Sequence, residues 1–248
     1  MQFGTLNSFL ISISRFFYYG TSSQERFDQL ATKSFNRQND NLYRGLFPLI
    51  PGKLSFKEGY DMGPLNYGKE TLEERTERLK NPFYGDTPRL MFPDEAERQR
   101  RVEELYQVIQ DHYGVLDRAA YTMMQLIAEA GDENSDYFAK TFEPYANNTY
   151  RLIMYPNREV KDIPKGAFLS DGRTMSTPPH QDSGFLTLLQ TFGFPGLELE
   201  LDGVWYSVPC PKGMLVVNVG EQLSAMSNNR FKATIHRVLD IGQDRYMY

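Results

Sequence analysis

Histidine is a scarce residue type in this chain, and its three copies occupy different kinds of segment. His112 lies at helical spacing from Ile109 and Leu116, on an apolar face. A histidine in that setting is predicted to be a core residue whose ring is hydrogen-bonded. His180 and His236 instead lie at or within expected strands, where side chains from distant segments can meet and share a metal ion.

The triplet His180-Gln181-Asp182 precedes an expected strand and can supply two metal ligands. Residues i and i+2 of an extended segment point to the same face, so His180 and Asp182 are expected to converge. Such a triplet is also common by chance. His236 strengthens the interpretation because it lies in another expected strand, 56 residues later. Two imidazoles and one carboxylate on neighbouring strands form the facial triad of non-haem Fe(II) oxygenases, with open positions for a cosubstrate and O₂.

Two further residues are candidates for holding a carboxylate. Arg245 follows His236 by nine residues and, in a strand paired with its neighbours, can hold a carboxylate through two parallel hydrogen bonds. Tyr155 ends an expected strand and offers a hydroxyl donor. The alternatives are a solvated arginine and a packing tyrosine. Arg173 and the segment 171–177 precede His180 and could line the mouth of the site, but this segment is expected to be a solvated loop.

The second half of the chain must position these residues, and its pattern is that of strands. From Thr149 onward apolar residues alternate and turns recur every 8 to 12 residues or so, which is typical of a sandwich or barrel. Asp202-Gly203 predicts a hairpin turn. The expected strands are Tyr150–Tyr155, Gly184–Gln190, Leu197–Leu201, Val204–Val208, Met214–Val219 and Ala233–Leu239.

The first half has helical patterns. Ser22-Ser23-Gln24-Glu25 predicts a capping box at the start of a helix. The stretch 43–68 is rich in Pro and Gly and is expected to be a loop with short extended pieces. A long helix is expected from Asp94 to Gly131, with apolar residues at every third, fourth or seventh position.

Composition narrows the class of protein. The chain has 248 residues, 27 basic against 32 acidic, for a net charge of −5. This acidic excess, without blocks of like charge, argues against nucleic acid or a membrane surface as partner. The single cysteine, Cys210, excludes an intrachain disulfide and indicates a reducing, cytoplasmic location. No apolar run is long enough to span a membrane.

The whole pattern resembles one family, the Fe(II)- and 2-oxoglutarate-dependent dioxygenases of the isopenicillin N synthase type. Its motifs include PHQDSGFLTLLQ around His180 and FKATIHRV around His236. The matching stretches are 151–156, 179–190, 196–199, 205–209, 213–220, 227–230, 231–238 and 245–246, with 43–45 and 57–64 nearer the N-terminus.

The resemblance implies an α+β fold: a double-stranded β-helix, or jelly roll, in the C-terminal half, backed by N-terminal and central helices. It implies a mostly helical region at 1–145 and a jelly-roll domain at 146–248. His180, Asp182 and His236 become the iron ligands, Arg245 pairs with the distal carboxylate of 2-oxoglutarate, and Tyr155 assists the binding of the cosubstrate or of a substrate carboxylate. The reaction implied is the oxidation of a small molecule by O₂, as hydroxylation or desaturation, with ascorbate as a candidate reductant.

The sequence also departs from the family pattern. Met247 stands where the family usually has a serine two residues after the arginine. The family's opening strand and C-terminal helix lack counterparts, so we expect a truncated jelly roll able to self-associate through an exposed sheet edge. Two alternatives stay open: an oxidase like isopenicillin N synthase that does not use 2-oxoglutarate, and an inactive fragment that only binds metal or protein.

Overall fold

The computed structural model describes residues 3–64, 70–142 and 146–247 and divides into two compact units. The first unit comprises Met1–Pro48 and Gly59–Leu152, and the second comprises Leu49–Glu58 and Ile153–Tyr248. Strand β3 carries the chain from the first unit to the second. The expected boundary between residues 145 and 146 stays a prediction, as does the backing of the jelly roll by helices.

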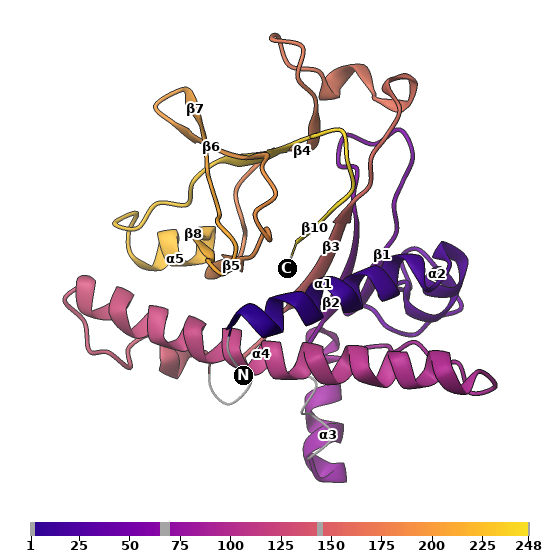
Figure 1. Ribbon diagram of the computed structural model, residues 1–248. Helices are drawn as coiled ribbons and strands as arrows, with labels where there is room; N and C mark the ends of the chain where they lie inside the picture. Colours follow the sequence, from indigo (N-terminus) through magenta and orange to yellow (C-terminus); the bar gives the residue numbers. More distant parts are fainter. Residues whose placement is uncertain (1–2, 65–69, 143–145, 248) are drawn as a thin grey trace. The chain divides into compact units, whose positions relative to one another are not determined.

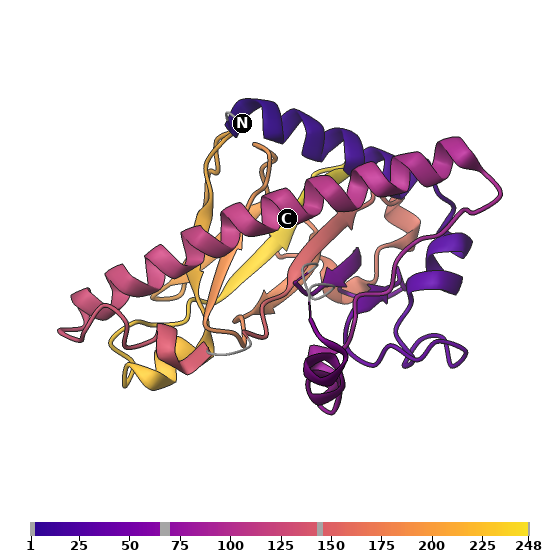
Figure 2. The same cartoon turned by 90° about the horizontal axis from the view of Figure 1, so that it is seen from below.

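The first unit is built mainly from helices. α1 (Phe3–Tyr19) packs along α4 (Ala96–Ala130), as Figures 1 and 2 show. α4 begins just after Pro93, and its cap residue Gly131 ends it, as the sequence predicts. The buried apolar side chains of α4 recur at helical spacing, so they lie on one face of the helix, and this face is covered. Among the described residues, none of the helices is long and apolar enough to cross a membrane.

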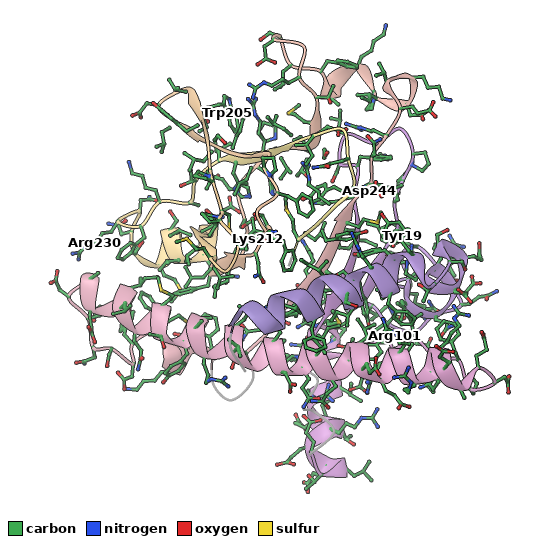
Figure 3. All side chains as sticks on the ribbon, viewed as in Figure 1. Tyr19, Arg101, Trp205, Lys212, Arg230 and Asp244 are labelled. Carbon is green, nitrogen blue, oxygen red and sulfur yellow. The ribbon has the colours of Figure 1, made fainter. Side chains whose placement is uncertain are left out.

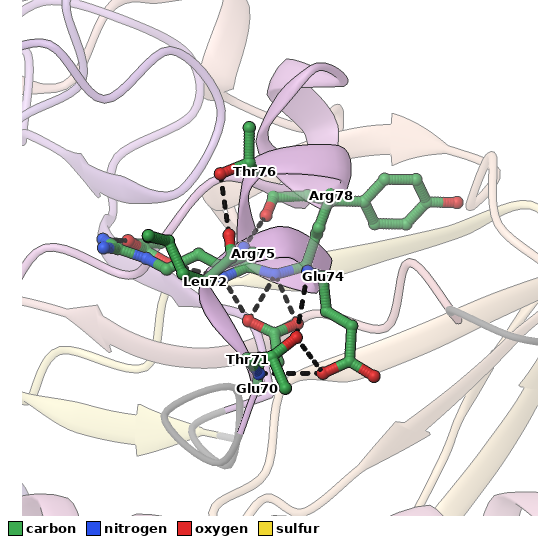
Figure 4. Close-up of polar contacts among 9 residues, drawn as sticks. Glu70, Thr71, Leu72, Glu74, Arg75, Thr76 and Arg78 are labelled. Atoms are coloured by element: carbon green, nitrogen blue, oxygen red, sulfur yellow. Dashed lines mark hydrogen bonds and ion pairs between the residues drawn. The ribbon is translucent and has the colours of Figure 1, made fainter.

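Capping boxes begin two shorter helices of this unit. α2 (Ser23–Leu30) has the predicted reciprocal bonds between Ser22 and Glu25. α3 (Leu72–Leu79) begins with a second box, between Thr71 and Glu74 (Figure 4). Short 3₁₀ turns follow at Pro82–Tyr84 and Ala139–Phe142. β1 (Gly45–Phe47) and β2 (Glu58–Met62) pair antiparallel within the stretch expected to be a loop with extended pieces.

The second unit contains antiparallel strands in jelly-roll order, with sheets β4-β9-β6-β7, β5-β8 and the pair β3-β10 (Figure 1). The strands are β3 (Tyr150–Tyr155), β4 (Met175–His180), β5 (Leu186–Leu189), β6 (Leu197–Leu201), β7 (Val204–Ser207), β8 (Val216–Val219), β9 (His236–Leu239) and β10 (Arg245–Met247). The 3₁₀ turns Val160–Asp162 and Lys165–Ala167 and helix α5 (Glu221–Met226) connect them.

The expected strands are confirmed, several with shorter bounds. The Asp202-Gly203 turn joins β6 to β7, and both residues have positive φ, 50° and 81°. One expectation is wrong: residues 175–177 are not a solvated loop but the buried start of β4. Pro178 and Pro179 argued against a strand there. They are tolerated because β4 is the end strand of its sheet, so among the described residues it pairs with a strand of that sheet on one side alone.

Alternation along the strands decides which residues face the interior of the second unit. Its core cluster contains Tyr155, Leu197, Val238 and Met247. Arg245 lies two residues before Met247 on β10 and is paired with Tyr155. Because alternate residues of a strand share a face, Arg245 lies on the interior face.

His112 is the buried core histidine that the sequence predicts. Its Nδ1 lies 2.7 Å from the Tyr150 hydroxyl, and the two rings meet edge to face. Burial lowers the pKa of His112 from 6.5 to about 4. The ring is therefore neutral in the folded protein at neutral pH.

This burial predicts an acid-sensitive fold. Below pH 6.5 the unfolded chain takes up a proton at His112 that the folded protein does not, so stability falls as the pH drops toward about 4. The shift corresponds to roughly 3 kcal/mol. Urea unfolding across this window should show a shallower loss in His112→Gln than in the original protein. Equal losses would contradict this role of His112.

Candidate active site

His180 and His236 meet because their strands pair. β4 and β9 are antiparallel, with His180 opposite His236. The ring centroids lie 4.2 Å apart. The register of this pairing shifts on both sides of Thr177. Such irregularities change the direction in which side chains point, and they are common next to active sites.

Asp182 completes the cluster from the connection between β4 and β5, just before the strand expected at 184–190. β4 ends at His180, and β5 begins only at Leu186. Even so, Asp182 Oδ1 lies 3.8 Å from His180 Nε2 and 3.6 Å from His236 Nε2. The predicted convergence is therefore confirmed, although simple strand alternation does not produce it.

The start of α5 fixes the backbone of this connection. The amide of Glu221 donates to Asp182 O at 2.8 Å, and that of Gly220 donates to Phe185 O at 3.0 Å. A Cβ at Gly220 would lie only 2.0 Å from Gly184 O. The approach is so close that only glycine fits at position 220, which keeps Asp182 in place.

Two residues that sequence reasoning missed orient the Asp182 carboxylate. Thr187 Oγ1 donates to its Oδ2 at 2.6 Å, and Asn218 Nδ2 donates to the same oxygen at 2.8 Å. Thr187 and Asn218 are direct partners in the β5–β8 ladder, so one register places both. The signal was a polar residue within each of two otherwise apolar strands.

Hydrogen bonds also orient the two imidazoles. His180 Nδ1 lies 3.0 Å from Pro178 O, and His236 Nδ1 lies 3.1 Å from Thr234 O. A carbonyl accepts only from a protonated nitrogen, so Nδ1 carries a proton in both rings, and Nε2 is the nitrogen left to bind a metal. Burial and the neighbouring His236 ring lower the pKa of His180, which favours the neutral, metal-binding form.

The cluster fits a divalent metal of the Fe(II) type. The three potential ligand atoms all lie within 4.8 Å of one another. Two ligand atoms about 2.1 Å from one ion lie about 3 to 3.5 Å apart, so the observed separations need only small rotations. Burial raises the pKa of Asp182, but the hydrogen bonds from Thr187 and Asn218 and the two imidazoles lower it overall, so the carboxylate is ionised.

Arg245 lies on the interior face with a guanidinium that pairs with no acidic group among the described residues. The residue is 1% exposed, and its partners are Ser176 Oγ and the carbonyls of Pro195 and Leu239. The acid whose charge acts on it, Asp240, pairs with Arg158 at 3.1 Å. Burying a cation without an anion is unfavourable, and burial lowers the pKa of Arg245. The setting therefore suits an anionic ligand.

Tyr155 lies directly beside this guanidinium. The Arg245 Cζ is 4.7 Å from the Tyr155 ring centroid, and the Tyr155 hydroxyl lies 3.5 Å from Thr177 Oγ1. In the ladder Thr177 pairs with Val238, and His236 lies two residues before Val238. Arg245, Tyr155 and the histidine cluster therefore share the interior of the second unit.

The outer face of the same sheet is stabilised by ion pairs. Glu198 bonds to Arg173 at 2.5 Å and to Arg237 at 2.6 Å. The Arg237 guanidinium lies 3.9 Å from the ring centroid of Trp205, which Figure 3 labels on β7. This layer stabilises β6 and β9 from the side opposite to His236.

Comparison with known proteins agrees with this geometry. Residues 146–248 match the model of the 2OG-Fe(II) oxygenase superfamily. The chain is 32% identical over 138 residues to gibberellin 20 oxidase 2 of Arabidopsis thaliana, covering 55% of this chain and 33% of that protein. It is 30% identical over 149 residues to clavatol oxidase of Penicillium crustosum, covering 58% and 42%. The chain thus matches well under half the length of either relative.

A solved structure supports the fold. A full-length protein of Neurospora crassa, crystallised in complex with alpha-ketoglutarate, superposes with a TM-score of 0.73 at 18% identity. The match covers 100% of this chain and 70% of that one. Residues 146–248 thus match the 2OG-Fe(II) oxygenase superfamily in sequence, and this part of the chain has jelly-roll strands and a His-Asp-His cluster.

Proposed function

We propose that this protein is a non-haem dioxygenase that couples oxidative decarboxylation of 2-oxoglutarate to the hydroxylation or desaturation of a small organic substrate. The observation that carries the proposal is the convergence of His180 Nε2, His236 Nε2 and Asp182 Oδ1, each oriented by a bond on its other polar atom. The family match and the relatives' names support it.

His180, Asp182 and His236 would hold Fe(II) from one side. The bound metal would supply O₂ activation, with ascorbate as an auxiliary reductant, and would leave three positions for O₂ and the 2-oxoacid. The protein's own share is positioning: Thr187 and Asn218 hold the carboxylate, and two backbone carbonyls hold the imidazoles. The ionised carboxylate of Asp182 needs no proton removal before it binds metal.

Arg245 would bind the distal carboxylate of 2-oxoglutarate, with Tyr155 beside it. The buried guanidinium gains an anion that the described part of the chain does not provide. A guanidinium and a carboxylate form strong charge-assisted bonds, and these strengthen where water is excluded. The distal charge would thereby fix which end of the 2-oxoacid faces the metal.

The second candidate is an oxidase of the isopenicillin N synthase type, which would need no 2-oxoacid. Met247, in place of a hydroxyl residue beside Arg245, favours it. The uncompensated charge of Arg245 favours the first candidate.

We further propose a cytoplasmic location, no nucleic-acid or membrane partner, and self-association through an exposed sheet edge.

Incubation with Fe(II), ascorbate and 2-oxoglutarate under air tests the proposal. Succinate release, dependent on both iron and O₂, is the expected result. Iron binding without succinate release would favour the second candidate. A protein without a cooperative melting transition would instead indicate an inactive fragment, since an unfolded chain cannot hold three ligands together.

Removal of a ligand imidazole should abolish iron binding. His180→Ala and His236→Ala each leave two ligands, and we expect iron content after reconstitution to fall to background. His112→Ala is the matched control, because His112 lies in the other unit and should affect only stability. Iron measurement by a colorimetric chelator decides the matter. Equal iron loss in all three variants would contradict the assignment.

Loss of a bond to the Asp182 carboxylate should weaken metal binding without unfolding the protein. Thr187→Val keeps the β-branched shape and removes the donor to Oδ2. Partners that orient a ligand typically account for about 10-fold to 100-fold in metal affinity. Thr191→Val removes another buried hydroxyl, bonded to Cys210 O, and is the control. Metal titrations giving the same affinity for both variants would refute this role.

Neutralising Arg245 should weaken cosubstrate binding but spare iron. Arg245→Gln removes the charge, and a lost bond to a charged group corresponds to about 10-fold or more in Kd for 2-oxoglutarate. Arg237→Gln, a buried arginine on the outer face of the sheet, is the control. Calorimetry on iron-loaded protein without O₂ measures the Kd for 2-oxoglutarate in both variants. An unchanged Kd in Arg245→Gln would remove Arg245 from the site.

A further inference from the structure

Ser176 lies at the start of β4, directly beside Arg245. Its Oγ accepts a hydrogen bond from Arg245 Nη2 at 3.2 Å, and the residue is 2% exposed. The backbone around it is held from two sides: Phe56 N donates to Ser176 O at 2.8 Å, and Arg158 Nη2 donates to Met175 O at 2.5 Å. The backbone of β4 therefore fixes the position of this hydroxyl, which does not lie on a surface loop.

The donor capacity of this hydroxyl is unused. Accepting from Arg245 occupies one lone pair of Oγ, while the O–H proton finds no acceptor among the described residues. Arg245 Nε also has no partner there. Buried donors without acceptors are unfavourable and rare in native proteins. Two such donors side by side, with no carboxylate near enough to bond, point to an acceptor that comes from outside the chain.

Neighbours on β10 do not supply a comparable donor. Met247 is the next residue on the same face as Arg245, and a thioether can only accept. A carboxylate has about four acceptor positions, so it can bond to the guanidinium and to a hydroxyl at once. Ser176 is the hydroxyl in direct contact with that guanidinium.

We infer that Ser176 binds the cosubstrate, donating its O–H to the distal carboxylate that Arg245 holds. This inference rests on the proposed function. Ser176 and Arg245 together would select 2-oxoacids with a second carboxylate, because a ligand without one leaves the same buried donors unpaired. The Ser176–Arg245 bond would also keep the guanidinium aimed at the ligand before it arrives.

The test compares two 2-oxoacids in iron-loaded protein without O₂. 2-Oxoglutarate carries the distal carboxylate, and 2-oxobutyrate lacks it. By calorimetry, Ser176→Ala should weaken 2-oxoglutarate binding about tenfold or more and leave 2-oxobutyrate binding unchanged. Equal weakening of both 2-oxoacids would show a general structural effect and overturn the inference.

Further variants separate the possible failures. Ser14→Ala removes a buried hydroxyl from α1, in the other unit, and should change neither affinity. Ser176→Cys keeps the volume with a much weaker donor and should also weaken 2-oxoglutarate binding, which covers the case in which Ser176→Ala does not fold. An unaltered protein that binds no 2-oxoglutarate would overturn the proposed function itself. Binding that is the same in the unaltered protein and the folded Ser176 variants would overturn only the role of Ser176.

Discussion

The pairing of β4 with β9 is the constraint on which the site depends. It places His180 opposite His236, although 56 residues separate them in the chain. Closing so long a loop costs entropy, and within it the strands pair as β5 with β8 and β6 with β7. The ion pairs of Glu198 and the stacking of Arg237 on Trp205 stabilise the outer face of the same sheet. Charge pairs on the outer face therefore stabilise β9, the strand that carries His236.

In each of the three side chains of the cluster, one polar atom is hydrogen-bonded within the protein and the other is left free. In both histidines Nδ1 is held by a carbonyl and Nε2 is left free, and in Asp182 Oδ2 is held and Oδ1 is left free. The free atoms point toward one another, and the Asp182 carboxylate among them is ionised. A cation at their centre would complete this arrangement.

The interior contains a second polar centre of opposite sign. Arg245 and Ser176 present donors without an acid, whereas the Asp182 cluster presents acceptors without a cation. Both lie in the interior of the second unit, whose buried core cluster includes the apolar side chains of Leu197, Val238 and Met247. An elongated dianion that reaches the metal at one end and the guanidinium at the other would satisfy both centres, and an apolar lining would strengthen each contact.

The sequence by itself determined the ligand types, the strand and helix boundaries with local signals, and the separate role of His112. Those features depend on short-range patterns: alternation, helical spacing, and capping and turn residues such as Ser22 and Asp202. Only the tertiary structure decided how Asp182 converges from a connection, which residues hold its carboxylate, and that residues 175–177 are a buried strand with Ser176 beside Arg245. These depend on registers between distant strands and on the contact of Gly220 with Gly184, and no local pattern encodes a register between segments that far apart.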